Sequence, residues 1–329
     1  MLNHERFESI LEHHRLPEDR LPIIEWSVWW DKTIANWESE GLPKSLTTQQ
    51  IFEYFDLDEH VQFWVRGVRE GVDSFHISTE EEYEAVMNDL YCDENIDKFI
   101  PKAKEIAGRS EEERPLVSIL IDGFFWHPRN IFGIEDHLFA FYDNQELMKR
   151  INRDQLAYNK KVIDRLSDIV KPDILCVAED MSYNLGSMIS KELYDEFMAP
   201  YYHELIPYAK SKGMTVFLDT DGNVEPLIPW FKEVGIEGVT PLERKAGVDV
   251  KRILEEHPDF LAMGAFDKLT MHLGEAAMRA EFERILPAMR TGRYIVSVDH
   301  QTPPEVNMEN YRIYRSLLEE YCIRAVKEN

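Results

Sequence analysis

The segment TVFLDTDGNVEPLIPWFKEVGIEGVT, residues 215–240, indicates the fold of this chain. Thr215–Leu218 is a short apolar run that predicts a buried strand, Val224–Val234 repeats apolar residues at helical spacing, and Gly238–Thr240 predicts the next strand. A strand, a helix and a second strand in this order are typical of a βαβ unit, whose two strands run parallel.

The same alternation continues on both sides of this segment. Further strands are predicted at Leu21–Trp26, Leu116–Asp122, Asp173–Ala178, Phe260–Phe266 and Arg293–Val298. Further helices are predicted at Asn144–Val170, Lys191–Lys212, Val248–Glu256, Ala276–Met289 and Asn307–Val326. Such a series forms either an open doubly wound sheet or a closed barrel. No GxGxxG motif follows a strand and no GxxxxGK[ST] motif occurs, so the sequence favours an α/β fold of the (β/α)8 TIM barrel type.

The first third of the chain has a different sequence pattern from the rest. Residues 1–110 are mainly helical in pattern, and we expect them to form an N-terminal helical cap together with the first barrel strand. Residues 111–329 are expected to supply the remainder of the barrel as one continuous domain. The charged stretch RSEEERP at 109–115 is too short for a linker.

Composition excludes several classes of function. The 329 residues are 44% hydrophobic and 30% charged, with a formal net charge of −25 and no run rich in Lys or Arg. Such a chain repels nucleic acid and anionic membranes. The acidic, polar N-terminus is not typical of a signal peptide, no apolar run is long enough for a membrane span, and we expect a cytoplasmic protein. Three scattered cysteines without CxxC spacing predict neither a disulfide framework nor a thiolate zinc site.

Carboxylic acids follow most of the predicted strands. They are Glu25, Asp122, Glu179, Asp180, Asp219, Asp221, Glu243, Asp267 and Asp299. In a barrel the carboxyl ends of the strands meet at one face, where the active site is built. The alternative is that strand ends are polar only because loops are polar.

Asp219 and Asp221 are the sharpest of these candidates. They share a side if the strand continues through them, and two carboxylates so close need a cation, a shared proton or a hydrogen-bonded clamp. The alternative is a turn in which Asp221 caps the following helix. His300 follows the strand YIVSV and can bind a metal or shuttle a proton, or it is simply a histidine of a surface loop.

Aromatic residues gather in two places. Trp26, Trp29 and Trp30 lie just after the first predicted strand, and Trp126 and His127 follow another strand end. With Tyr183, they are candidates for the wall of an apolar substrate pocket. Packing of the N-terminal cap on the barrel is the alternative explanation.

At these residues the chain resembles the uroporphyrinogen decarboxylase superfamily. The resemblance rests on AEDM at 178–181, MISKELYDEFMAPYYHELIPYAKSKG at 188–213, the DGN turn at 221–223, IPWFKEVGIEGVTPLERKAGVDVKRI at 228–253, MGAFDK at 263–268 and GRYIVSVDHQTPPEVNMENY at 292–311. It implies a (β/α)8 barrel and either porphyrinogen decarboxylation or corrinoid-linked methyl transfer.

The sequence argues against the decarboxylase branch of that superfamily. The true decarboxylase carries an arginine-bearing motif after its first strand for a substrate with eight carboxylates. Here the stretch Leu21–Pro43 holds one cation, Lys32, against four acids, so it would repel a polyanion. A small, largely apolar substrate suits the tryptophans better.

The methyltransferase branch is closer, and the resemblance implies a metal site with changed ligands. Those enzymes bind zinc through a His-x-Cys pair and a later Cys. By position, Asp219, Asp221 and His300 stand at or near these places, which implies a divalent metal, Zn first, held by harder ligands.

We therefore expect methyl transfer between a small substrate, such as a methoxylated aromatic, and a cobalamin, with the metal acting as a Lewis acid on the heteroatom that bears or receives the methyl group. The corrinoid (methylcobalamin) would be held by a separate protein. The expected catalytic residues are Glu179, Asp180 and Asp219, the first two as proton donor or substrate clamp, while His127 and Tyr183 orient the substrate. Two alternatives remain open: a metal-independent decarboxylase or lyase acting on a smaller acid, and a non-catalytic partner of a corrinoid protein.

Overall fold

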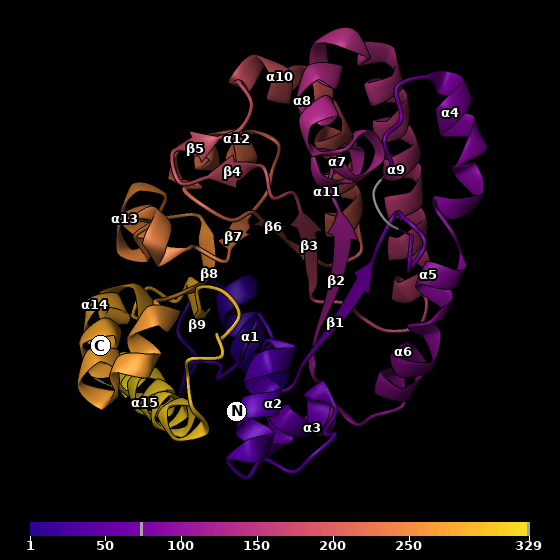
Figure 1. Ribbon diagram of the computed structural model, residues 1–329. Coiled ribbons are helices and arrows are strands. Elements are labelled where there is room, and N and C mark those ends of the chain that lie inside the picture. The colour runs from indigo at the N-terminus through magenta and orange to yellow at the C-terminus, as the bar shows by residue number, and fades with distance from the viewer. Residues whose placement is uncertain (73–74, 328–329) are drawn as a thin grey trace.

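A curled parallel sheet with helices on its outer side organises the chain, as the computed structural model shows for residues 1–72 and 75–327 (Figure 1). Within these residues the sheet has seven strands in the order β1-β2-β3-β6-β7-β8-β9, and every neighbouring pair is parallel. The strands are β1 His60–Val65, β2 Leu116–Asp122, β3 Ile174–Ala178, β6 Thr215–Asp219, β7 Gly238–Thr240, β8 Leu261–Phe266 and β9 Tyr294–Val298. Short strands β4 Ser182–Tyr183 and β5 Gly186–Ser187 form a separate hairpin.

Helices connect the strands and cover the sheet. They are α1 Asn3–Leu11, α2 Asp31–Ser39, α3 Thr48–Tyr54, α4 Glu80–Ala85, α5 Glu94–Asp97, α6 Ile100–Ala107, α7 Trp126–Phe132, α8 Ile134–Asp143, α9 Gln145–Ser167, α10 Lys191–Phe197, α11 Ala199–Ser211, α12 Ile228–Glu233, α13 Val250–Glu256, α14 Glu275–Met289 and α15 Met308–Lys327. The single helix predicted at Lys191–Lys212 is two helices, because α10 ends at Phe197 and α11 restarts with Pro200 in its first turn.

The α/β barrel class predicted from the alternating pattern is confirmed. Strands β2 and β7 have the predicted bounds, and β3, β6, β8 and β9 differ from prediction by one residue at one end. Every residue of β2, β3, β8 and β9 is buried. Burial on both faces explains why these strands read as continuous apolar runs in the sequence.

The sequence pattern does not predict strand β1, because residues 1–110 are mainly helical in pattern and their one predicted strand is Leu21–Trp26. Its sequence HVQFWV pairs with β2, with Val61 opposite Val117. Its residues are not uniformly buried, and Trp64 is exposed near its end. The N-terminal third therefore contributes a regular barrel strand.

The strand predicted at Leu21–Trp26 is wrong in detail, since this segment is extended but joins no ladder. It still connects the two outer strands of the sheet. The Trp26 N–H donates to Ser297 Oγ of β9 at 3.1 Å, and the Trp26 carbonyl accepts from Gln62 Nε2 of β1 at 2.8 Å. The segment thus links the two edge strands through side-chain hydrogen bonds, and the Asp58 N–H donates to the Ile23 carbonyl at 2.8 Å, without forming a backbone ladder.

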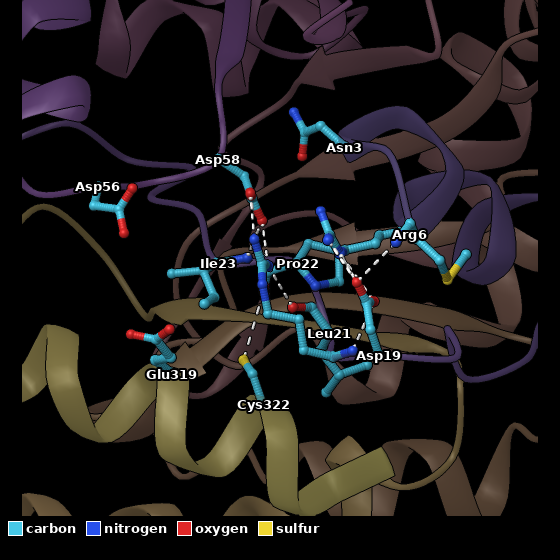
Figure 2. Close-up of polar contacts among 12 residues, drawn as sticks. Asn3, Arg6, Asp19, Leu21, Pro22, Ile23, Asp56, Asp58, Glu319 and Cys322 are labelled. Atoms are coloured by element: carbon cyan, nitrogen blue, oxygen red, sulfur yellow. Dashed lines mark hydrogen bonds and ion pairs between the residues drawn. The ribbon is translucent and has the colours of Figure 1, made fainter. Parts of the chain in front are cut away.

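We call Leu21–Trp26 the closing segment, and polar contacts hold it from two sides (Figure 2). Arg20 donates two hydrogen bonds of 2.6 Å to Asp58, which also accepts the Ile23 N–H at 2.8 Å. From α15, the Cys322 carbonyl accepts the Leu21 N–H at 3.2 Å. These contacts fix the segment that brings Trp26 to the carboxyl ends of the strands.

None of the helices in the described residues combines the length and apolar character needed to cross a bilayer.

Candidate functional site

A cavity of about 360 Å³ opens at the carboxyl ends of the strands, and we call it the strand-end cavity. Its walls come from the closing segment, from β1, β2, β3 and β6, and from the loop after β9. They are formed by Trp26, Ser27, Val28, Gln62, Trp64, Leu120, Trp126, Ala178, Asp180, Asp219, Asp221, His300 and Gln301. The structure therefore brings together both acids of the 215–223 segment, His300 and two of the predicted aromatic residues.

Asp219 and Asp221 lie in the wall of this cavity, Asp219 as the last residue of β6. Burial raises the pKa of Asp219 well above its ordinary value, and the neighbouring carboxylates of Asp221 and Asp180 raise it further. Burial, followed by repulsion from Glu243 and Asp180, raises the pKa of Asp221 to about 7. Near neutral pH this pair holds protons that ordinary aspartates release.

His300 faces Asp221 across the cavity. Its Nε2 lies 3.8 Å from Asp221 Oδ2, and its Nδ1 accepts a hydrogen bond from the Gln301 N–H at 2.8 Å. Accepting at Nδ1 assigns the proton of the neutral ring to Nε2. Burial, helped by Lys268, lowers the pKa of His300, so the ring is neutral at pH 7.

Asp180 occupies a strained position beside this pair. Its backbone has φ of +46°, in the left-handed region that non-glycine residues seldom adopt. Its carboxylate lies 3.3 Å from Arg129, whose guanidinium stacks 5.1 Å from the ring centre of Trp126. Asp180 is thus tied to the aromatic wall while it faces the cavity.

A lysine flanks the acids on the other side. Lys268 is 3.7 Å from Asp299 and 3.9 Å from Glu243. Asp299 accepts the N–H groups of Arg244 and Lys268, while Glu243 accepts the N–H of Gly222. These predicted strand-end acids therefore fix the loops around Asp221, and they do not line the cavity.

Glu179 has a different environment from the one expected of a catalytic acid. It is fully buried and outside the cavity wall, and its carboxylate accepts the N–H groups of Phe124, Phe125 and Trp126 at 2.8, 2.7 and 3.1 Å. The Tyr202 hydroxyl donates to the same carboxylate. Burial raises the pKa of Glu179 to about 7 despite these donors. Its contacts fit a clamp on the start of α7 better than the predicted proton donor.

Gly123 leaves the space that the Glu179 carboxylate occupies. A Cβ atom on Gly123 would lie 2.2 Å from the Glu179 carboxyl carbon, so a larger residue would displace the carboxylate.

Two other strand-end acids are also buried away from the cavity. Glu25 accepts hydrogen bonds from Ser297 at 2.9 Å and Tyr311 at 3.0 Å, and burial raises its pKa to about 7. Asp122 is fully buried beside Arg66. These side chains connect elements of the barrel.

Four of the six predicted substrate-binding residues lie elsewhere. Trp29 is 3% exposed and packs on Trp37 and Phe52 as part of the core. His127 is fully buried with its Nε2 3.0 Å from the Tyr91 hydroxyl, so packing explains it as well.

Trp30 and Tyr183 are exposed, and neither lines the strand-end cavity. The two residues that do line it are Trp26 and Trp126.

Sequence reasoning missed Trp64 and Gln62, because it missed β1. Trp64 is 45% exposed and forms a cavity wall. The apolar and aromatic content of HVQFWV is a strand signal that would have identified both residues.

The predicted metal ligands lie close to one another, but they are not arranged to coordinate one ion. Among the described residues, no three His, Cys, Asp or Glu side chains are arranged so that they could hold one ion. The Asp219, Asp221 and His300 set as placed therefore does not fit a three-ligand zinc centre. Uptake of an ion by these residues stays a prediction.

The chain is similar to uroporphyrinogen decarboxylases in sequence and to a methyltransferase in structure. A family model described as "Uroporphyrinogen decarboxylase (URO-D)" matches residues 143–321. A uroporphyrinogen decarboxylase from Nautilia profundicola is 24% identical over 267 residues, which cover 76% of this chain and 72% of that protein. A solved structure, a methyltransferase from Methanosarcina mazei, is 14% identical and superposes with a TM-score of 0.68 over 96% of this chain and 98% of its own. The likeness to the methyltransferase supports the fold.

Proposed function

This chain belongs to the uroporphyrinogen decarboxylase family, and from that premise we propose that it is a methyltransferase acting on a small methoxylated aromatic compound. The observation that carries the proposal is the strand-end cavity, in which Trp26, Trp64 and Trp126 stand beside Asp219 and Asp221. An aromatic ring fits between tryptophans, and an ether oxygen can reach a carboxyl group.

The charge of the cavity argues against a polyanionic substrate. Among the described residues that line it there are three aspartates and one histidine, and no lysine or arginine. A carboxylate placed in this poorly solvated site would find no cation among these lining residues to pair with. The charge of this cavity therefore favours methyl transfer over porphyrinogen decarboxylation.

The carboxyl groups supply the proton that ether cleavage needs. When the methyl carbon–oxygen bond breaks, the bond's electron pair remains on the aryl oxygen, which must gain a proton to leave as a phenol. Asp221 lies in the cavity wall, and its pKa of about 7 keeps a fraction of it protonated at neutral pH. In this proposal Asp221 donates that proton, and neutral His300 lies beside it with Nε2 3.8 Å from its carboxyl oxygen.

The methyl group needs an acceptor that brings its own electron pair. A corrinoid carried by a partner protein would supply this nucleophile when bound. The residues of this chain hold the aromatic ring, exclude water and deliver the proton.

The test follows the methyl group directly. Purified protein is incubated with a corrinoid protein and an aromatic ether labelled with ¹³C in the methyl group, and the label is followed by NMR. We expect transfer of label and release of the phenol, with Asp221→Asn slowing release at least about tenfold. The control is Asp259→Asn, which changes an exposed aspartate paired with Lys232 and should leave the rate unchanged. Release of ¹³CO₂ from a carboxyl-labelled aromatic acid, with the ether intact, would instead establish the decarboxylase alternative.

A further inference from the structure

A second cavity of about 630 Å³ lies beside the strand-end cavity, between the end of β1, α5 and the start of α7. We call it the basic cleft, because its walls include Arg66, Arg69 and Lys98 and one acid, Glu70. The chain has a formal charge of −25, so a recess whose lining holds three cations and one acid differs from the chain as a whole. Cations at a cavity wall favour an anionic ligand.

The two cavities share walls. Trp64 and Trp126 line both of them. The Arg66 guanidinium lies 5.7 Å from the ring centre of Trp64, so a cation flanks the shared aromatic wall. A ligand that lies along these two tryptophans would have one end at Asp221 and the other among the cations.

The cations of the basic cleft are paired with carboxylates, yet they remain accessible. Arg66 contacts the buried Asp122 at 3.2 Å and Lys98 contacts Glu70 at 2.8 Å, while Arg66 and Lys98 keep 39% and 38% of their side chains exposed. Arg69 contacts Asp89 at 3.3 Å and is 41% exposed. The Lys98–Glu70 and Arg69–Asp89 pairs join exposed side chains and are weak, so an incoming anion can compete for Lys98 and Arg69, whereas buried Asp122 holds Arg66 in place.

We propose that the basic cleft binds a carboxylate on the substrate, so that the substrate is an aromatic acid whose ether group is remote from its carboxylate. This inference rests on the proposed function and narrows its substrate class. The two ends of such a molecule match the two cavities, because the described lining of the strand-end cavity offers a carboxylate no cation, whereas the basic cleft offers three. With the carboxylate in the basic cleft, the ether end of the substrate reaches Asp221.

Two variants of one ion pair test the subsite. Lys98→Gln removes a cation and Glu70→Gln removes the only acid among the described residues that line the cleft, and both break the same contact. The probes are 4-methoxybenzoate and 4-methoxytoluene, which have similar shapes and differ in charge. Binding is measured by calorimetry without a corrinoid protein or turnover.

We expect the acid to bind at least about tenfold more tightly than the neutral ether. Lys98→Gln should weaken binding of the acid by about three- to tenfold, and Glu70→Gln should tighten it by about threefold. Neither change should alter binding of the neutral ether. Lys102→Gln, on the exposed face of α6, is the matched control and should have no effect.

Several outcomes would overturn the subsite. These are equal binding of the two probes, shifts of the same sign for Lys98→Gln and Glu70→Gln, and competition by inorganic phosphate with no binding of the aromatic acid. The last result would show that the cleft serves a free phosphate. Because the assay needs no turnover, charge-dependent binding without methyl transfer would support the subsite and reject only the proposed reaction.

Discussion

Nε2 of His300 lies 3.8 Å from Oδ2 of Asp221, although the two residues are separated by 79 positions in the chain. The distance is too long for a hydrogen bond and short enough for electrostatic coupling. Because Nδ1 of His300 accepts the Gln301 N–H, the N–H of the ring faces the carboxyl group. The contact brings a neutral imidazole to an acid that titrates near pH 7.

Asp221→Asn should stabilise the protein, and more so at higher pH. The folded-state pKa of Asp221 is about 7 against 3.8 for an ordinary aspartate, so the folded protein binds this proton more tightly than the unfolded chain does. Stability is therefore lost as the pH rises from about 4 to about 7, and asparagine escapes that loss. Since the side chain is 42% exposed, we expect the gain at pH 8 to exceed that at pH 5.5 by only about 1 kcal/mol.

Urea unfolding of both proteins at the two pH values measures this difference. Asp259→Asn, at an exposed aspartate whose pKa is lowered by its contact with Lys232, should show no gain at high pH. A gain for Asp221→Asn that is the same at both pH values would contradict the assignment.

Glu179→Gln should destabilise the fold by about 2–4 kcal/mol, because an amide nitrogen would replace an oxygen that accepts buried backbone N–H groups. Tyr202→Phe removes one donor to the same carboxylate and should cost about 1 kcal/mol. Chemical denaturation checks both values. Full stability combined with lost activity in Glu179→Gln would restore the catalytic role predicted from sequence.

Trp29→Ala and Trp64→Ala should separate packing from binding. Trp29 is 3% exposed, so its removal should cost about 3–5 kcal/mol of unfolding free energy. Trp64 is 45% exposed and lines both cavities, so Trp64→Ala should cost less than about 1 kcal/mol and weaken binding of 4-methoxybenzoate. Unfolding curves and calorimetric titrations give the two readouts. The reverse pattern would make Trp29 the pocket residue.

The Arg20–Asp58 pair should show a measurable coupling energy. The side chains are 21% and 11% exposed and share two hydrogen bonds of 2.6 Å. A double-mutant cycle with Arg20→Gln and Asp58→Asn should give about 1–3 kcal/mol. The exposed Lys102–Glu105 pair, treated in the same way, should give less than about 0.5 kcal/mol. Equal coupling in the two pairs would mean that Arg20 does not hold the closing segment.

The sequence pattern alone identifies the barrel class and most of its strands. Runs such as LVSILID at 116–122 and ILCVA at 174–178 are apolar without interruption, because parallel strands are buried on both faces. It also determined that Asp219, Asp221 and His300 would be neighbours, since all three follow strands whose carboxyl ends meet at one edge.

The role of each strand-end acid follows from how the distant parts of the chain pack around it. Glu179 and Asp180 are adjacent in sequence, yet one is buried on the N–H groups of residues 124–126 and the other faces the cavity. The closing segment, the role of Trp64 and the charge of the basic cleft were likewise settled by partners far along the chain. Local patterns of hydrophobicity predict elements, but the environment of a side chain depends on which distant residues pack against it.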